Sequence, residues 1–295
     1  METLEQLAGT LESLEDLRSI VRTMKALAAA SIRQYERAVE SLRQYNRTVE
    51  LGLHVVLREM PEPTARPHRS HGPMGIIVFG SDHGLCGRFN GDLADFVREH
   101  LQARAETEDV RVLVVGARMA PLVEEAGMPV DETLAVPGSA ARITALVDQI
   151  FLTLDTWQAE VDVVSVHLFY NRRRAGSRTD PMAQRLLPVD LHRFHRLEEE
   201  PWPSRVLPTF SMNRERLFAA LVRQYLFVSL FRACAESQAA EHASRLSAMQ
   251  SASRNLDDRQ TELVGEFRRR RQGVITAELL DVVAGYEALN PANPS

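Results

Sequence analysis

The sequence predicts an α/β domain inserted between two long helical arms that pair as an antiparallel coiled coil. Of 14 prolines, 12 lie within residues 61–208 and two in the last five residues, so 1–60 and 209–290 hold none. An interior proline costs a helix roughly 3 kcal/mol, so both proline-free arms can be continuously helical. Between the arms, β-branched runs alternate with helical patterns, which favours a mostly parallel, Rossmann-like sheet.

Heptad repeats run through the first arm. Eight positions spaced by seven carry no charge: Leu7, Leu14, Val21, Ala28, Tyr35, Leu42, Val49 and Val56. A companion track is apolar at both ends and interrupted by Arg18 and Lys25 in its middle. A period of 3.5 residues indicates a left-handed supercoil around a partner helix.

The second arm supplies that partner. Seven heptad positions are apolar except for His242: Leu221, Val228, Ala235, His242, Met249, Leu256 and Leu263. We assign His242 to structure, paired with Glu241 or with a residue of the first arm. Ser211 or Asn213 can cap the start of this arm, and its end is expected shortly after Gly285. It is longer than the first arm, and the long insertion between them favours an antiparallel pair.

The central insertion begins after an irregular linker rich in proline and basic residues, at about 60–73. Strands are expected at 75–79, 110–115 and 161–169, and helices at about 91–105, 118–126 and 139–157. The expected organisation is therefore a coiled-coil helix at 1–60, an α/β domain with its linker at 61–208, a second coiled-coil helix at 209–290, and a tail at 291–295.

Composition excludes several classes of protein. A net charge of −5, with 44% hydrophobic and 25% charged residues, is typical of a globular chain. The acidic N-terminus is unlike a secretory signal, no apolar run approaches about 18 residues, and we expect a cytosolic protein. Cys86 and Cys234 are too few for a disulfide framework or a zinc site. We expect no metal and no cofactor.

A glycine-rich turn follows the first expected strand, from Gly80 to Gly87. Its spacing differs from G-x-G-x-x-G and it carries no Walker lysine. We therefore favour a structural tight turn over nucleotide binding, and the residues assigned to that turn are Ser81, Asp82, Gly84 and Gly87. A catalytic pair of His83 and Cys86 is the weaker interpretation of the same turn.

Two arginine clusters stand out. Arg172–Arg174 end an expected strand and are assigned to a solvated loop. Arg268–Arg271 surround a helix turn at 100° per residue, so one buried face cannot hide them all. The net charge and the lack of interleaved aromatic residues argue against nucleic acid. A protein that surrounds this part of the helix would have to present acidic side chains or water to these arginines.

The second arm resembles the C-terminal helix of the gamma subunit of F-type ATP synthases. The matching positions, spread over about 60 residues, are Glu236, Ser237, Glu241, His242, Arg245, Met249, Ala252, Asn255, Arg271, Gln272, Ile275, Thr276, Glu278, Gly285 and Glu287. Residues 24–29, Met-Lys-Ala-Leu-Ala-Ala, resemble the family's A-M-K-M-V-A-A. Residues 81–87, Ser-Asp-His-Gly-Leu-Cys-Gly, resemble its S-D-R-G-L-C-G. The resemblance covers the chain in order.

Several positions depart from the family pattern. Histidine replaces the usual arginine at 83, arginine a glycine at 88, and arginine an asparagine at 268; Ala240 and Leu246 also differ. The N-terminus is acidic where the family has a basic start. These departures suggest a divergent branch, such as the alternate ATPase that some bacteria carry beside a housekeeping enzyme.

The resemblance implies a non-catalytic rotor subunit that couples ion flow to ATP synthesis or hydrolysis. Its implied partners are the alpha and beta subunits of the ring, the epsilon subunit and the c subunits of the membrane rotor, at the cytoplasmic side of the bacterial inner membrane. The residues implied to contact the stator are Met24, Lys25, Arg271, Gln272 and Thr276. Two other classes remain open: a coiled-coil adaptor, and an α/β nucleotide-binding enzyme with helical arms.

Overall fold

The computed structural model describes residues 3–58, 72–102, 109–174, 179–191, 194 and 208–289. Most of the expected linker and the expected tail lie outside these residues. The chain forms two compact units. The distal unit, as we call it, combines 1–27 with 248–295, and the sheet unit comprises 28–247.

Two long helices contribute to both units. Helix α1 spans Leu4–Arg58 with 55 residues, and α6 spans Arg214–Leu289 with 76. All eight heptad positions of α1 and all seven of α6 are buried or half-buried, as the repeats predict. Asn213 caps α6, because its Oδ1 accepts a hydrogen bond from the Arg216 amide at 3.2 Å. Of the two capping candidates, the structure therefore selects Asn213.

The two helices run antiparallel within each unit. In the distal unit, the Arg18 guanidinium lies 3.0 Å from Asp257 Oδ1 and donates to Gln260 Oε1 at 3.0 Å. In the sheet unit, the Tyr35 ring stacks on His242, and Tyr45 donates to Gln224 Oε1 at 2.7 Å. Partner numbers on α6 fall as those on α1 rise, so the expected antiparallel pairing is confirmed.

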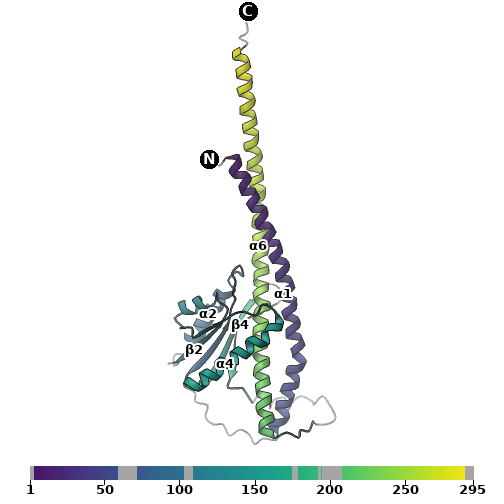
Figure 1. Ribbon diagram of the computed structural model, residues 1–295, viewed down its shortest axis with the longest axis vertical. Coiled ribbons are helices and arrows are strands. Elements are labelled where there is room, and N and C mark those ends of the chain that lie inside the picture. Colours follow the sequence, from purple (N-terminus) through teal and green to yellow (C-terminus); the bar gives the residue numbers. More distant parts are fainter. Residues whose placement is uncertain are drawn as a thin grey trace, which may run out of the picture. The chain divides into compact units, whose positions relative to one another are not determined.

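A five-stranded sheet forms the centre of the sheet unit (Figure 1). Its strands are β1 Met74–Phe79, β2 Val110–Val115, β3 Glu132–Leu134, β4 Ser165–Arg173 and β5 Thr179–Leu187, in the order β3-β2-β1-β4-β5. All neighbours pair in parallel except β4 and β5. The central strand β1 is buried along its whole length, as expected where helices cover both faces. The predicted mostly parallel sheet is confirmed.

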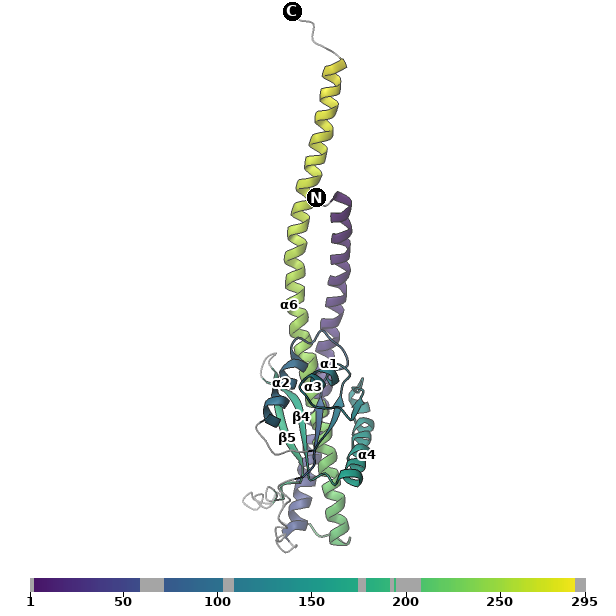
Figure 2. The same cartoon turned by 90° about the vertical axis from the view of Figure 1, so that its left-hand side faces the viewer.

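Helices cover both faces of this sheet, and Figure 2 shows α2 and α4 on opposite sides of it. Helices α2 Phe89–Gln102 and α3 Ala120–Glu125 pack on one face, around Leu93, Val97 and Val123. Helix α4 Ile143–Val161, which follows a 3₁₀ turn at Ala140–Arg142, packs on the other face. Residues 226–239 of α6 share that face with α4. The long C-terminal helix is thus part of the core.

Three details of the sheet were not predicted correctly. The third strand was expected from residue 161, but Val161 ends α4 and β4 starts at Ser165. Asp162, in the left-handed conformation with φ of 52°, terminates the helix between them. Strand β3 has only three residues, and β5 contains Pro181 with few β-branched side chains, so neither carried a strand signal.

Candidate functional site

Ser81 and Asp82 fasten the glycine-rich turn that follows β1. Ser81 is buried; its amide donates to Asn90 Oδ1 at 3.1 Å, and its Oγ accepts from Asn90 Nδ2 at 2.8 Å. The Asp82 carboxylate accepts from the amides of Ala117 and Val136, both at 2.9 Å. One carboxylate therefore joins the turn to the segments that follow β2 and β3.

Two of the turn's glycines are needed for steric reasons. A Cβ on Gly80 would lie 2.2 Å from Met119 Cβ, and Gly87 has a φ of +62°. Gly84 has neither constraint, since a Cβ there would meet no atom within 4 Å. Leu85 also adopts a left-handed φ, of 63°, and is 59% exposed. Of the two glycines assigned to the turn, only Gly87 has a conformational reason to be glycine.

Three side chains of helix α6 donate hydrogen bonds to the main chain of this turn and of the strand end before it. Ser237 Oγ donates to the Phe79 carbonyl at 3.1 Å, and Ser244 Oγ donates to the Cys86 carbonyl at 2.6 Å. The Arg245 guanidinium donates to the carbonyls at residues 83 and 84, both at 3.4 Å. Doubly wound folds hold phosphates beyond the carboxyl end of such a strand. Here the side chains of α6 fill that place.

A buried polar network backs the contact. Arg245 Nη2 lies 2.7 Å from Glu241 Oε1, and Gln238 donates to Glu241 Oε2 at 3.2 Å. Burial raises the pKa of the Glu241 carboxyl, an effect that Arg245 and Gln238 oppose. The side chains of Arg245 and Glu241 are only 12% and 6% exposed, so each compensates the other's charge away from water.

His242 belongs to the same network as a neutral ring. Its centroid lies 5.8 Å from that of Tyr35, with the rings 17° apart, and its Nδ1 lies 3.3 Å from Arg245 Nη1. Burial and the nearby arginine lower the pKa of His242 to about 4. Tyr35 donates its hydroxyl hydrogen to the Pro137 carbonyl at 2.9 Å. The expected partner on the first arm is therefore Tyr35, and Glu241 pairs with Arg245 instead.

Cys86 and His83 do not form a reactive pair. Cys86 is 3% exposed, and its Sγ lies 3.7 Å from the His83 carbonyl oxygen. Burial raises the pKa of the Cys86 thiol, which disfavours the thiolate that a nucleophile needs. Within the described residues, no group of three or more metal-ligating side chains could hold an ion.

The predicted stator contacts lie in the distal unit and fall into two separate groups. Arg271, Gln272 and Thr276 are exposed on α6, whereas Met24 and Lys25 are half-buried on α1. The contact between Arg18 and Asp257 sets the register. From that level the two groups extend in opposite directions along the pair, about 30 Å apart at 1.5 Å per residue. They cannot form one patch.

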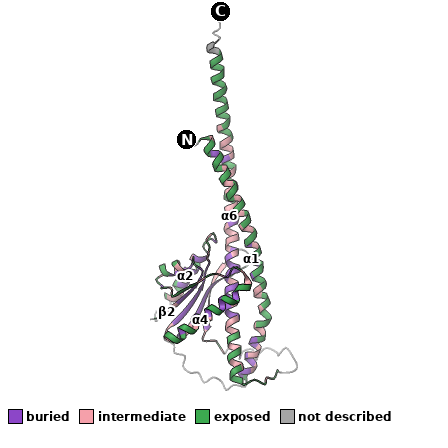
Figure 3. Ribbon diagram, viewed as in Figure 1, coloured by how far each residue is buried: buried purple, intermediate pink, exposed green. Residues whose placement is uncertain are grey.

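The distal unit also carries an exposed apolar surface that the sequence analysis did not identify. From residue 271 to 286 every side chain of α6 is exposed (Figure 3). Seven of them are large and apolar, 44–72% exposed: Val274, Ile275, Leu279, Leu280, Val282, Val283 and Tyr286. The signal was available, because the second arm is longer than the first, and among the described residues its last apolar side chains have no partner helix.

One stretch within Arg214–Tyr286, of mean hydropathy 1.4, is long and apolar enough to cross a membrane by length and composition alone. Core helices of soluble proteins pass the same test. In the sheet unit, α6 contributes Val228, Leu230 and Ala233 to the buried interior. In all, 28% of that stretch is buried, and its occurrence contradicts the expectation that no apolar run approaches about 18 residues.

A family model of ATP synthase matches residues 3–289. The ATP synthase gamma chain of Roseobacter denitrificans is 31% identical over 220 residues, 72% of either chain. That of Ehrlichia chaffeensis is 28% identical over 223 residues, 73% of this chain and 74% of the relative. Among solved structures, a chain of the Euglena gracilis mitochondrial ATP synthase aligns with a TM-score of 0.67 at 18% identity, covering 98% of this chain and 95% of its own. A chain of the Tetrahymena thermophila central stalk and c-ring aligns at 0.57 and 21% identity, covering 79% and 99%.

Proposed function

Because the chain belongs to the gamma-chain family of ATP synthases, we propose that it is the central-stalk rotor subunit of a membrane-associated ATP synthase. In this role its rotation couples transmembrane ion flow to ATP synthesis or hydrolysis in a ring of alpha and beta subunits. The observation that carries the proposal is the distal unit. It consists of a paired helical seam that ends in a stretch of α6 whose side chains are exposed on every side.

A shaft must be packed inside and free to turn outside. The seam of the distal unit supplies the packing, with Leu7, Met249 and Leu263 at most 4% exposed. Many outer positions of the paired part are glutamate, arginine, glutamine and serine, whose hydrated side chains exchange partners at little cost. Such a surface suits repeated contact with several pockets in turn. An asymmetric shaft can then set several catalytic sites in different states.

The arginine collar, residues 268–271, is the proposed contact with the beta subunits. Arg268, Arg269 and Arg271 are exposed, while Arg270 lies 3.4 Å from Glu266. A guanidinium can bind a carboxylate through two parallel hydrogen bonds, and a pair at an exposed surface forms and breaks readily. Gln272 and Thr276 extend the same exposed stretch. Met24 and Lys25 would meet the stator at a separate level.

The exposed apolar end of α6 calls for a partner of its own. Positions 275, 279, 282 and 286 follow helical spacing and form one apolar stripe. A contiguous apolar surface of this kind marks a site of interaction with another protein. We propose that an apolar sleeve at the top of the ring surrounds it and serves as a bearing.

The remaining assignments follow from the same role. The subunit itself has no catalytic residue and no cofactor, and nucleotide binds to the ring. The epsilon subunit and the c subunits are its partners in the rotor. It is peripheral to the bacterial inner membrane on the cytoplasmic side. The arms are 1–60 and 209–290, with the α/β domain at 61–208 and a tail at 291–295.

The proposal is tested with the double variant Arg271→Ala and Gln272→Ala. ATP hydrolysis and ATP-driven ion uptake would be measured together in inverted membrane vesicles. We expect the ring and the rotor to assemble normally and ion uptake to fall severalfold, because the collar loses one charged and one neutral contact. The matched control is Gln250→Ala with Arg254→Ala, which removes the same two residue types from exposed positions on the same helix.

Normal coupled ion uptake in the collar variant would contradict the assignment of Arg271 and Gln272. Failure of the wild-type chain to co-purify with alpha and beta subunits would contradict the rotor function itself. An equal loss in the control variant would show that any exposed contact on α6 matters, and would remove the special role of the collar.

A further inference from the structure

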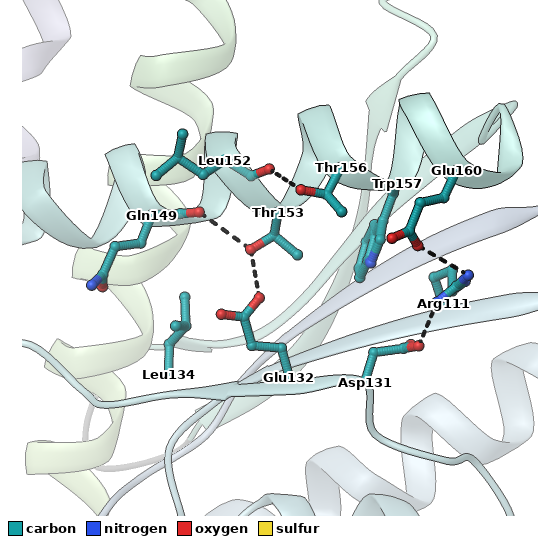
Figure 4. A pocket seen from close by; sticks show the side chains of 10 residues that line it. All are labelled: Arg111, Asp131, Glu132, Leu134, Gln149, Leu152, Thr153, Thr156, Trp157 and Glu160. Atoms are coloured by element: carbon teal, nitrogen blue, oxygen red, sulfur yellow. Dashed lines mark hydrogen bonds and ion pairs between the residues drawn. The ribbon is translucent and has the colours of Figure 1, made fainter.

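A groove of about 520 Å³ lies along the edge of the sheet, between β3 and α4 (Figure 4). The buried ring of Trp157 forms part of its lining. Glu132 and Leu134 contribute from β3, and Leu152 and Glu160 from α4. The groove is remote in the sequence from the glycine-rich turn and from both groups of predicted stator contacts, so none of the assignments above accounts for it.

Ion pairs and hydrogen bonds hold the groove in shape. Arg111 Nη1 lies 2.9 Å from Asp131 Oδ1, and its Nη2 lies 3.4 Å from Glu160 Oε2. Thr153 donates to Glu132 Oε2 at 2.7 Å. These contacts join β2, the segment before β3, β3 itself and α4. Glu132 and Glu160 each keep a second carboxylate oxygen, which can accept a further hydrogen bond. The walls are thus fixed before any partner arrives.

Acidic side chains outnumber basic ones in the segment that forms the groove. Residues 131–162 contain six acidic side chains, all exposed, against Arg142 as the single basic one. Adding Arg111, which is shared between Asp131 and Glu160, and Arg223, whose guanidinium lies over the Phe151 ring of α4, still leaves six carboxylates against three guanidinium groups. Such a field attracts cationic groups and repels phosphate, so nucleic acid and anionic lipid surfaces do not fit.

An apolar contact point stands beside these charges. Leu152 is 69% exposed, and Asp148 and Asp155 lie four residues before and three residues after it. Residues at this spacing are neighbours on one helix face. Leu134 is half-buried on the β3 side of the groove. A ligand that fits must therefore combine a cation with an apolar group, which a basic peptide segment does and a hydrated metal ion does not.

We propose that this groove docks an extended basic segment of another subunit of the same complex. A lysine or arginine of that segment lies between Glu132 and Glu160, and a neighbouring apolar side chain packs on Leu152. Strand β3 has only three residues, so side-chain contacts rather than strand addition carry the interaction. The inference rests on the proposed function, because it takes the partner to be a subunit of the ATP synthase.

The test is photo-crosslinking in the purified complex. Benzophenone-alanine replaces Leu152 in one preparation and the exposed Glu99 of α2, on the other face of the sheet, in a second. We expect a probe at 152 to cross-link one other subunit, at a peptide that contains lysine or arginine, and a probe at 99 to leave that peptide unlabelled. The yield from 152 is expected to fall as salt rises from 50 to 300 mM.

Charge reversal gives a second measurement. Asp148→Lys with Asp155→Lys should lower the cross-link yield at 152 about tenfold, whereas Glu124→Lys with Glu125→Lys, on α3, should leave it unchanged. A cross-linked peptide without a basic residue, or a yield unaffected by the first pair, would overturn the proposal. So would the absence of any adduct in a complex that retains this chain. Absence of the chain from the complex would instead contradict the proposed function.

Discussion

Two stretches of α6 share one continuous helix but have opposite surroundings. In the sheet unit, residues 228–241 are buried at 11 of 14 positions, and Phe231 is half-buried. In the distal unit, residues 271–286 are exposed throughout. The buried stretch contains Ala233, Cys234, Ala235, Ala239 and Ala240, whose small side chains let the helix lie close to its neighbours. The exposed stretch instead carries leucine, isoleucine and valine.

The difference shows that apolar content alone does not decide burial. Side chains in the exposed stretch are larger and as apolar as those in the buried stretch, yet no described residue covers them. Small residues matched to a sheet mark a helix that packs within its own chain. Large apolar residues with no partner helix mark one that packs against another chain. Substitutions in the two stretches should therefore have very different effects on the isolated chain.

The largest expected difference comes from Leu230→Ala compared with Leu280→Ala. Leu230 is fully buried, so its truncation leaves a cavity and should cost about 3 to 5 kcal/mol of unfolding free energy. Leu280 is 60% exposed, and its truncation should change the value by no more than about 0.5 kcal/mol. Denaturant titration followed by circular dichroism measures both. Equal effects would refute the distinction between the two stretches.

Arg245→Met should destabilise the isolated chain by about 3 kcal/mol, because it leaves the Glu241 carboxylate buried without its ion pair. The matched change Arg268→Met, at an exposed position, should be close to neutral. Adding Glu241→Gln to Arg245→Met should recover more than half of the loss. If the added change instead deepens the loss, the ion pair is not the source of the effect.

His242 should make stability depend on pH below neutrality. Its pKa is lowered to about 4 in the folded chain, so between pH 6.5 and 4 the unfolded chain takes up a proton that the folded chain does not. The unfolding free energy should therefore fall as pH is lowered, by about 2 kcal/mol at pH 5. Comparing wild type with His242→Phe isolates this contribution, because Glu241 titrates in both. Parallel pH profiles would contradict it.

The smallest expected effect concerns the start of α6. Asn213→Ala should cost about 1 kcal/mol, because the Arg216 amide loses its hydrogen-bond acceptor. Asn213→Asp, which keeps an acceptor, should be tolerated. Ser211→Ala, at the other candidate cap, should have little effect. Thermal unfolding of the four proteins side by side would reveal a cap at Ser211 if that expectation is wrong.

The elements that carry a heptad repeat, and the boundaries that proline marks, were predicted correctly from the sequence. Heptads from Leu7 to Val56 and from Leu221 to Leu263 specified both helices and their pairing, because period and proline are local signals. Strands β3 and β5 escaped prediction, since their place in the sheet comes from neighbours rather than from their own composition. The end of α4 was missed because a β-branched run continues across Asp162, whose left-handed conformation is not encoded by apolar pattern.

The candidate site likewise contains residues that could be assigned from the sequence and contacts that could not. Ser81 and Asp82 could be assigned to the turn from its type, whereas the bonds from Ser237, Ser244 and Arg245 join residues about 160 positions apart. Spacing along one chain cannot reveal such a contact. The 30 Å separation of Met24 from Arg271 likewise required the register between the two helices.

The hydrogen bonds that dock α6 onto the turn have a consequence for how the turn can evolve. Ser237, Ser244 and Arg245 all donate to main-chain carbonyls, those of Phe79, Cys86 and residues 83 and 84. Every amino acid offers the same carbonyl, so the side chain at 83 is released from selection for docking. The docking contacts are therefore compatible with histidine at 83, where the resemblance implies an arginine, and they leave that exposed side chain available to other partners.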